Sequence, residues 1–362
     1  MKKTGRFCAL VLVICMLAGC GSKSGSDSAA APRMGDYSVE ASLAFLDPDA
    51  EVLSVGGLSV SWREYHAYML MAVAHILNET GETSVADWDA AYSGAVTQYS
   101  QAMSYGEYVK FYAWDTAGLY RTIDLQFAAQ GLTLDADRVE TKETFMSKNG
   151  LTEDAEFDDY LAENGLTEDL FNAIQEGNTK YGLLLEAQFG KNGQDCPDSE
   201  VAAYAESFGY VRVKQIFISG VTDTSREKAE TILAALQAAA PEELETVFDE
   251  YVESDSEDDS GKSVYPDGYL YLPGSMNDAF EAAAEALGEN QLGGVVESSS
   301  GYHIILRLPI DYDQVPYGAS VPLRYLAAAD RFDSIMAMWQ ASEETVYTET
   351  YDQIIPAEVF VN

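Results

Sequence analysis

At 362 residues the chain is too long for one ordinary hydrophobic core, so two domains are expected, and its hydrophobic content of 47% argues against wholesale disorder. Its 60 acidic residues stand against 21 basic ones, which gives a formal net charge of -39. A surface this acidic repels phosphate backbones, so nucleic acid is a poor candidate partner, whereas solubility and weak attraction for basic, unfolded chains are favoured.

The N-terminus has the pattern of an export signal. Basic side chains at Lys2, Lys3 and Arg6 precede the apolar run 8–17, which is too short to span a bilayer as a stable helix. The sequence Leu-Ala-Gly-Cys then ends at Cys20 and resembles a bacterial lipobox, whose cysteine is diacylated and becomes the mature N-terminus. Two acyl chains hold a protein on a membrane far better than one. We therefore expect a lipid anchor on the extracytoplasmic face of the cell membrane; a secretory signal with a coincidental cysteine is the alternative.

Cysteine usage agrees with this interpretation. The expected signal peptide covers 1–19, and 20–48 comprise the lipidated cysteine and a flexible tether rich in Ser, Gly, Ala and Asp. After removal of the signal and lipidation, Cys196 is the one remaining thiol, so neither a disulfide framework nor a zinc site is expected. The sequence predicts no metal site and no cofactor, and no later stretch is apolar enough to be transmembrane.

The first half of the remaining chain has a helical pattern. Residues 52–60 read as two short strands around a Gly-Gly turn, and Ser61 with Glu64 three residues later predicts a helix N-terminus. Helical periodicity then dominates to about residue 208.

Gly-Leu-Thr occurs three times, at Gly131, Gly150 and Gly165, each time followed shortly by an acidic residue. This pattern predicts helix ends at glycine turns, after which new helices begin.

The pattern changes at Tyr210, where β-branched residues predict a strand over 211–218. Three helices are expected next, and their start signals are Thr224 with Glu227, Pro241, and Ser275, with a polar loop at 253–263 before the third helix and Gly288 closing it. Strands at 294–297 and 302–308 complete an α+β unit of roughly 100 residues. A further amphipathic helix is predicted from about Leu323 to Glu343.

Three segments of this unit carry a resemblance to a known family. They are 213–218 (Val-Lys-Gln-Ile-Phe-Ile), 274–280 (Gly-Ser-Met-Asn-Asp-Ala-Phe) and 300–306 (Ser-Gly-Tyr-His-Ile-Ile-Leu), and in this order they resemble a parvulin-type peptidyl-prolyl isomerase domain. Residues 55–60 and 165–170 resemble the N-terminal domain of SurA/PrsA-type foldases. The resemblance implies an α+β fold, with a mostly helical SurA/PrsA-like chaperone domain and an inserted parvulin-like domain that has a small antiparallel sheet with helices.

The resemblance also implies domain boundaries. The N-terminal helical chaperone domain is expected over 49–208 and the parvulin-like domain over 209–309. The C-terminal helical segment, 310–362, packs on the N-terminal domain in that family.

The same resemblance assigns site residues. Met276 and Phe280, one helical turn apart, match positions that form the pocket for the proline ring; spacing alone favours the alternative that both are core residues. His303 matches the second of two family histidines, with a satisfied core histidine as the alternative. Gln215 occupies the position of the first histidine, and the acidic or thiol position falls near Ser254 or Asp255. The implied catalytic set is His303, Gln215 and Asp255.

The predicted function is that of a membrane-anchored, extracytoplasmic foldase with peptidyl-prolyl cis-trans isomerase activity. Its partners would be unfolded or partly folded exported polypeptides, bound at prolyl segments. Because glutamine cannot titrate, a non-catalytic holdase that binds peptides through a degenerate parvulin domain is the alternative. A solute-binding lipoprotein is disfavoured, since such proteins usually alternate strands and helices throughout two lobes.

Overall fold

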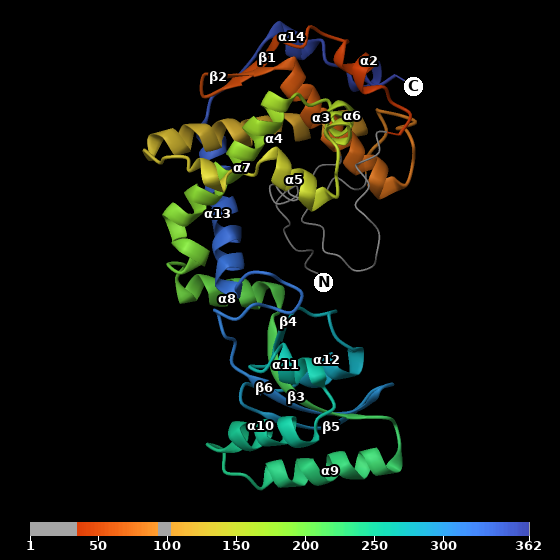
Figure 1. Ribbon diagram of the computed structural model, residues 1–362, viewed down its shortest axis with the longest axis vertical. Helices are drawn as coiled ribbons and strands as arrows, with labels where there is room; N and C mark the ends of the chain where they lie inside the picture. The colour runs from red at the N-terminus through yellow and green to blue at the C-terminus, as the bar shows by residue number, and fades with distance from the viewer. Residues whose placement is uncertain (1–34, 93–102, 362) are drawn as a thin grey trace. The chain divides into compact units, whose positions relative to one another are not determined.

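The computed structural model describes residues 35–92 and 103–361, and within these ranges the chain is mostly helical with two small antiparallel sheets (Figure 1). This confirms the predicted class of helices combined with small antiparallel sheets. The expected signal peptide and Cys20 lie outside the described residues. Within those ranges, no helix combines the length and the apolar character that crossing a membrane requires.

The chain divides into two compact units. Unit 1 comprises the described parts of Met1–Gln188 together with Arg331–Asn362, and unit 2 comprises Phe189–Asp330. Unit 2 is therefore an insertion in the sequence of unit 1. It is longer at both ends than the expected parvulin-like domain, 209–309.

Unit 1 consists mainly of helices with one three-stranded sheet, whose strand order is β2-β1-β7. Its elements in chain order are α2 (Val39–Leu43), β1 (Glu51–Val55), β2 (Leu58–Ser61), α3 (Trp62–Thr80), α4 (Tyr105–Ala129), η1 (Ala136–Arg138), α5 (Lys142–Asn149), α6 (Asp154–Glu163) and α7 (Glu168–Phe189), then the part of α13 (Leu323–Ser342) from residue 331 onward, β7 (Thr345–Tyr347), α14 (Glu349–Asp352) and α15 (Pro356–Val359). The predicted hairpin at 52–60 and the predicted helix near 323–343 are present. Ser61 caps α3 by accepting a hydrogen bond from the backbone N–H of Glu64.

The end of the expected tether is ordered, which corrects the prediction of a flexible segment up to residue 48. Helix α2 begins after Ser38, whose side chain caps it. Trp62 Nε1 donates to the carbonyl of Leu43 at 2.8 Å, and Ser42 Oγ lies 2.8 Å from His66 Nε2. These buried contacts with α3 fix a segment whose composition alone indicates flexibility.

The three Gly-Leu-Thr glycines lie at turns with positive φ angles of 64°, 72° and 63° for Gly131, Gly150 and Gly165. Gly150 is the left-handed C-cap of α5, a conformation that costs glycine little because it lacks a Cβ atom. The predicted helix-ending role of these glycines is confirmed.

Unit 2 is built around a four-stranded antiparallel sheet with strand order β4-β3-β6-β5. Its elements are η2 (Lys191–Gly193), α8 (Asp198–Phe208), β3 (Val211–Ser219), α9 (Asp223–Gln237), α10 (Leu244–Asp255), α11 (Asp259–Ser263), β4 (Tyr269–Tyr271), α12 (Asp278–Glu285), β5 (Leu292–Glu297) and β6 (Gly301–Leu308). In the central pair, β3 and β6, Gln215 lies opposite Ile305 and Phe217 lies opposite His303. This register decides which side chains share a face, because successive residues of a strand point to opposite sides.

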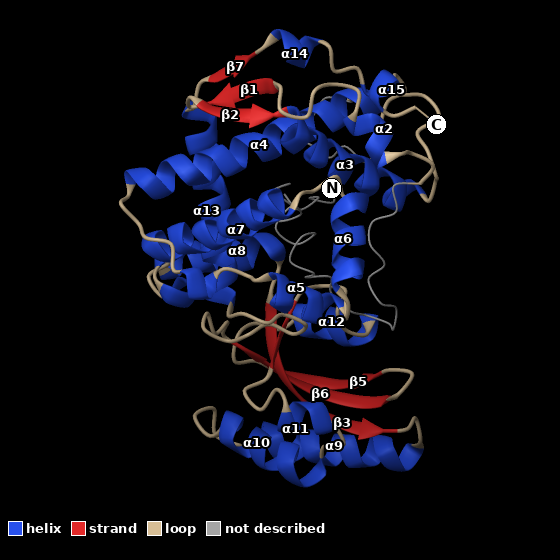
Figure 2. Ribbon diagram, turned by 45° about the horizontal axis from the view of Figure 1, so that its top comes forward, coloured by secondary structure: helices blue, strands red, loops and turns tan. Residues whose placement is uncertain are grey.

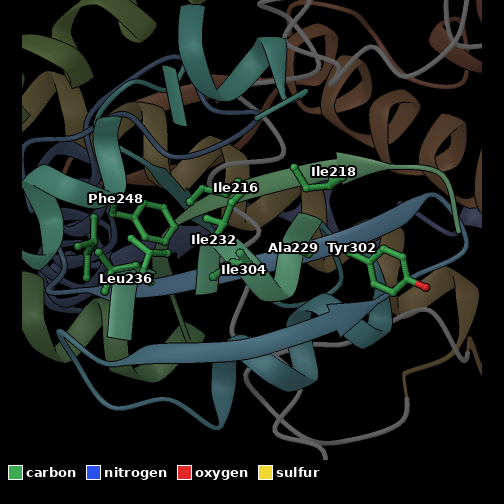
Figure 3. Close-up of a cluster of buried hydrophobic side chains, with 10 residues drawn as sticks. Ile216, Ile218, Ala229, Ile232, Leu236, Phe248, Tyr302 and Ile304 are labelled. Atoms are coloured by element: carbon green, nitrogen blue, oxygen red, sulfur yellow. The ribbon is translucent and has the colours of Figure 1, made fainter. Parts of the chain in front are cut away.

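One face of this sheet, which we call the closed face, is covered by α9 and α10 (Figure 2). Ile216 and Ile218 of β3 and Ile304 of β6 belong there to one buried cluster with Phe248 of α10, which is fully buried (Figure 3). Burial of each such side chain stabilises the fold by about 1.5–3 kcal/mol. The other buried members of this cluster are Ala229, Ile232, Leu236, Tyr302, Leu306 and Leu308.

The opposite face, which we call the α12 face, is covered only in part. Helix α12 contributes Phe280 and Ala284 to a second buried cluster. The other buried members of that cluster are Val211, Val213, Tyr269, Tyr271 and Ile305. Gln215 and His303 point to this same face but are only half-buried. The gap in coverage places polar side chains at the surface of the sheet.

Four local predictions for unit 2 need correction. Thr222, not Thr224, caps α9. Asn277, not Ser275, caps α12, so Met276 lies in the preceding loop and is not one helical turn from Phe280 on the same helix. Helix α10 begins at Leu244 and not at Pro241. The expected polar loop 253–263 instead contains the last turn of α10 and the short helix α11. Strand β4, three residues long, was too short for its pattern to be recognised.

Candidate active site

The candidate site lies on the α12 face, where the side chains of β3 and β6 are not covered by α12. His303 on β6 is the central residue. Its Nδ1 atom lies 2.8 Å from Oε1 of Gln215, and its Nε2 atom lies 2.8 Å from Oγ of Ser298. Gln215 comes from the neighbouring strand, so the pairing of β3 with β6 brings together two residues 88 positions apart in the sequence.

Aromatic rings enclose the imidazole of His303. The ring centroid of Phe217 is 4.9 Å away, and that of Phe280 is 5.5 Å away in an edge-to-face arrangement. Burial among these rings lowers the pKa of His303 below its ordinary value, and the negative charge of Asp258 opposes part of this effect. Burial thus favours the neutral form of the His303 imidazole.

Asp258 supplies the carboxylate of the candidate site. Its Oδ2 atom accepts a hydrogen bond from Nε2 of Gln215 at 2.7 Å, and the hydroxyl of Tyr269 donates to it at 2.9 Å. Asp258 also caps α11 by accepting the backbone N–H of Gly261 at 3.0 Å. Burial and the bond to Asp258 raise the pKa of Tyr269, so its hydroxyl remains a donor. The result is a continuous hydrogen-bonded chain of five side chains: Ser298, His303, Gln215, Asp258 and Tyr269.

Asp255, the predicted acidic residue, is not part of this chain. It is the last residue of α10, where its carboxylate lies 3.3 Å from Nζ of Lys228 and accepts from Ser254 at 2.8 Å. The carboxylate that joins the hydrogen-bonded chain is thus Asp258, three residues after the predicted Asp255, and Ser254 is not part of that chain either. Asp258 was missed because the run 255–259 holds several acidic residues; the one local signal was an Asp followed three residues later by Gly261, a pattern compatible with a helix cap.

The structure places the two predicted pocket residues in one hydrophobic cluster. Phe280 is 3% exposed and contacts His303, while Met276 is partly exposed and packs against the same cluster from the loop before α12. That loop is fastened to α12, because the backbone N–H groups of Gly274 and Met276 donate to Glu281. Met276 and Phe280 thus meet through tertiary packing and not through helical spacing.

An open pocket of about 410 Å³ lies beside the hydrogen-bonded chain. Its lining residues are Gln215, Phe217, Glu257, Asp258, Asp259, Ser260, Ser300 and His303. Phe217 gives this pocket an aromatic side chain, and the other lining residues offer hydrogen-bonding groups. Such a surface can bind and partly desolvate an extended peptide, and binding of this kind requires no covalent chemistry.

Residues 212–308 match the family described as Rotamase: PPIC-type PPIASE domain. These limits run from β3 to the end of β6, so they contain every residue of the hydrogen-bonded chain. A segment of 83 residues is 40% identical to the Drosophila melanogaster protein dodo, described as a candidate peptidyl-prolyl cis-trans isomerase. This stretch covers 23% of the present chain and 49% of dodo, so the chain spans about half the length of this relative.

Two solved structures of PrsA are also similar. The protein from Bacillus anthracis is 20% identical, with 61% of this chain and 92% of that chain covered and a TM-score of 0.25; the protein from Bacillus cereus is 18% identical, with 74% and 98% covered and a TM-score of 0.27. With TM-scores this far below 0.5, neither similarity carries an argument about this chain. The family match alone covers the whole hydrogen-bonded chain. Residues 212–308 form a PPIC-type, or parvulin-type, peptidyl-prolyl isomerase domain.

Proposed function

We propose that the chain catalyses cis-trans isomerisation of X–Pro bonds in polypeptides. The observation that carries this proposal is the position of His303 within the domain 212–308. It is hydrogen-bonded to Gln215 and packed edge-on against the buried Phe280, and it lines the open pocket together with Phe217, so polar groups and an aromatic surface meet there.

The chemistry needs no more than such a surface. Rotation about an X–Pro bond faces a barrier of about 18–20 kcal/mol and takes tens of seconds or longer when uncatalysed. An enzyme lowers this barrier by holding the proline ring against apolar side chains, by removing water from the imide and by stabilising the twisted state. Phe217, which lines the pocket, and the partly exposed Met276 supply apolar contact, and Gln215 and His303 supply hydrogen-bonding groups.

The proposed setting is the extracytoplasmic face of a membrane, with the chain held there by lipid on Cys20. The support for this part is the sequence pattern of Lys2, Lys3, Arg6 and the apolar run 8–17 before that cysteine. The partners would be unfolded or partly folded exported polypeptides. The helical unit 1 would then act as a chaperone domain that holds clients while the inserted domain acts on their prolyl segments.

A second candidate function is favoured by Gln215. A glutamine amide donates and accepts hydrogen bonds but does not titrate, so a pair of histidines cannot form at this position. A non-catalytic holdase would retain the pocket for peptide binding. Its test is prevention of client aggregation by the full chain beside a variant that lacks 210–309: absence of protection by the full chain would eliminate the holdase, and absence of protection by the variant alone would count against a chaperone role for unit 1.

The isomerase proposal is tested by the rate of cis-to-trans conversion of a proline peptide by the full chain in detergent micelles. We expect His303→Ala to lower kcat/KM about 100-fold, the lower end of the range seen when one donor that stabilises a transition state is removed. Met276→Ala should mainly raise KM, because it removes apolar contact with the bound ring.

Two control variants match these substitutions. His75→Ala removes a histidine of unit 1 that pairs with Glu79, and Met338→Ala removes a methionine of unit 1 that is 59% exposed. Both controls should retain the full rate. Background rates for the unmodified chain and all variants alike would eliminate the isomerase proposal and leave the holdase.

A further inference from the structure

We propose that Asp258 fixes which ring nitrogen of His303 carries the proton, through the Gln215 amide that lies between them. Asp258 is in this view a positioning residue, because it acts on the site through another side chain. Three consecutive hydrogen bonds carry the inference: from Asp258 to Gln215, from Gln215 to His303, and from His303 to Ser298. The effect on catalysis rests on the proposed isomerase function, whereas the effect on the imidazole does not.

The first step is the orientation of the Gln215 amide. An ionised carboxylate only accepts hydrogen bonds. Asp258 accepts from the backbone N–H of Gly261 at 3.0 Å and from the Tyr269 hydroxyl at 2.9 Å, so the carboxylate is held in place by two further donors. An amide facing Asp258 at 2.7 Å must therefore present its NH₂ group. The amide oxygen of Gln215 then points to His303.

The second step is the proton on His303. Two acceptors cannot face each other at 2.8 Å, so the Nδ1 atom opposite the Gln215 oxygen must carry the proton. In the neutral imidazole, Nε2 is then an acceptor. Ser298 Oγ lies 2.8 Å from it and donates its hydroxyl proton, while it accepts the backbone N–H of Ser300 at 3.2 Å. With an ionised Asp258, only this arrangement places a donor opposite an acceptor at all three contacts.

The third step predicts how the arrangement reverses. In Asp258→Asn, the N–H of Gly261 still needs an oxygen at the Oδ1 position, because that bond caps α11. The new NH₂ group then occupies the Oδ2 position and faces Gln215. Gln215 turns its oxygen toward Asn and its NH₂ group toward His303, so Nδ1 becomes the acceptor and Nε2 carries the proton.

Ser298 can accommodate this reversal without moving. Its hydroxyl rotates, accepts from the protonated Nε2 atom and donates to the carbonyl oxygen of Gly301, which lies 3.3 Å away. A substitution at Asp258 therefore changes the face that His303 presents to a peptide in the pocket, although Gln215 and His303 keep their places.

The experiment is long-range ¹H–¹⁵N correlation NMR of the full chain, which distinguishes the two neutral forms of imidazole. The chain has three histidines, so the signals of His303 are identified by their loss in His303→Gln. We expect a protonated Nδ1 atom in the unmodified protein above pH 7.5 and a majority of protonated Nε2 in Asp258→Asn. The matched control is Asp255→Asn, the same substitution three residues earlier, which should keep the original form.

A second variant covers the case in which Asp258→Asn does not fold. Gln215→Met has a similar shape but no hydrogen-bonding amide, so His303 should populate both neutral forms. A protonated Nε2 atom in the unmodified protein, or an unchanged imidazole in the folded Asp258→Asn and Gln215→Met proteins, would overturn the inference.

Kinetics separate this inference from the proposed function. Asp258→Asn should lower kcat several-fold with little change in KM, since the pocket keeps its shape and only the polarity of His303 is reversed. If the unmodified chain does not isomerise a proline peptide, the proposed function fails, and the NMR result still decides the role of Asp258.

Discussion

The two faces of the sheet in unit 2 are built from the same strands but are filled differently. On the closed face, α9 and α10 cover alternate residues of β3 and β6, and the side chains there are mostly apolar and buried; the exception is Lys214, which pairs with Glu245 and Asp249 of α10. On the α12 face a single short helix covers one end, and Gln215 and His303 remain at the other. A one-residue change of register would exchange the two sets of side chains.

Within one domain, the closed face therefore contributes mainly to stability, and the α12 face carries the candidate site. Complete coverage by two helices buries a continuous apolar cluster on the closed face, which supplies hydrophobic stabilisation. Incomplete coverage leaves room for a pocket and for a hydrogen-bonded chain whose members are held by packing on the other side. The closed face thus holds β3 and β6 in the register that the site requires.

The largest expected effect tests the role of the closed face. Phe248→Ala removes a fully buried ring and should lower the free energy of unfolding of unit 2 by about 3–5 kcal/mol. The same substitution at Phe217, which is half-buried on the α12 face, should cost about 1–2 kcal/mol. All four tryptophans lie in unit 1, so hydrogen exchange of the β3 and β6 amides is the suitable measurement. Equal losses at the two positions would contradict the comparison.

The closed face could be predicted from the sequence and the α12 face only in part. Strands β3 and β6 and helix α9 have strong periodic patterns, and their existence follows from residue spacing. The family resemblance named Gln215, Phe280 and His303, and the structure brings these three side chains together on the α12 face. The order of strands around β3 is set by long-range pairing, which spacing along the chain does not reveal.

The acidic position could not be predicted for a physical reason. Asp255 and Asp258 lie in the same polar run, and which carboxylate reaches Gln215 depends on where α10 ends. The chain leaves α10 at Ser256, whose hydroxyl accepts the backbone N–H groups of Phe217 and Asp258. This tertiary contact with β3 turns the loop, and local propensity contains no information about it. Met276 was misplaced for the same reason, since Asn277 and Ser275 are both acceptable helix caps.

A smaller expected effect is the pH dependence of stability. It arises on the α12 face, which contains His303, and not on the closed face, which contains no histidine. Burial lowers the pKa of His303, so in the window below about pH 6.5 the unfolded chain binds more protons at this residue than the folded one. His303 therefore contributes stability above pH 6.5, and this contribution is lost as the pH falls from 6.5 through its folded pKa. The slope contributed by one group is at most about 1.4 kcal/mol per pH unit.

The measurement is the free energy of unfolding of unit 2 by hydrogen exchange at pH 5, 6 and 7. His303→Gln keeps polar groups at this position but cannot titrate, so its stability should fall less steeply with acidification. Parallel curves for the two proteins would show that burial of His303 has no consequence for its protonation.

The smallest effect compares two hydroxyl groups of strand β4. The Tyr269 hydroxyl donates to Asp258, whereas the buried Tyr271 hydroxyl has no hydrogen-bond partner among the described residues. Tyr269→Phe should cost about 1 kcal/mol, because Asp258 keeps its bonds from Gly261 and Gln215 and loses one donor.

Tyr271→Phe removes a polar atom that burial leaves unsatisfied, so it should be neutral or slightly stabilising. Both variants keep the aromatic ring, and therefore the difference between their unfolding free energies isolates the hydroxyl groups. If Tyr271→Phe lowered the free energy of unfolding as much as Tyr269→Phe, the hydrogen-bonded chain would not be confined to one end of the α12 face. The two ends of that face would then differ in exposure alone, and the hydrogen bond from Tyr269 would not be part of what holds Asp258 in place.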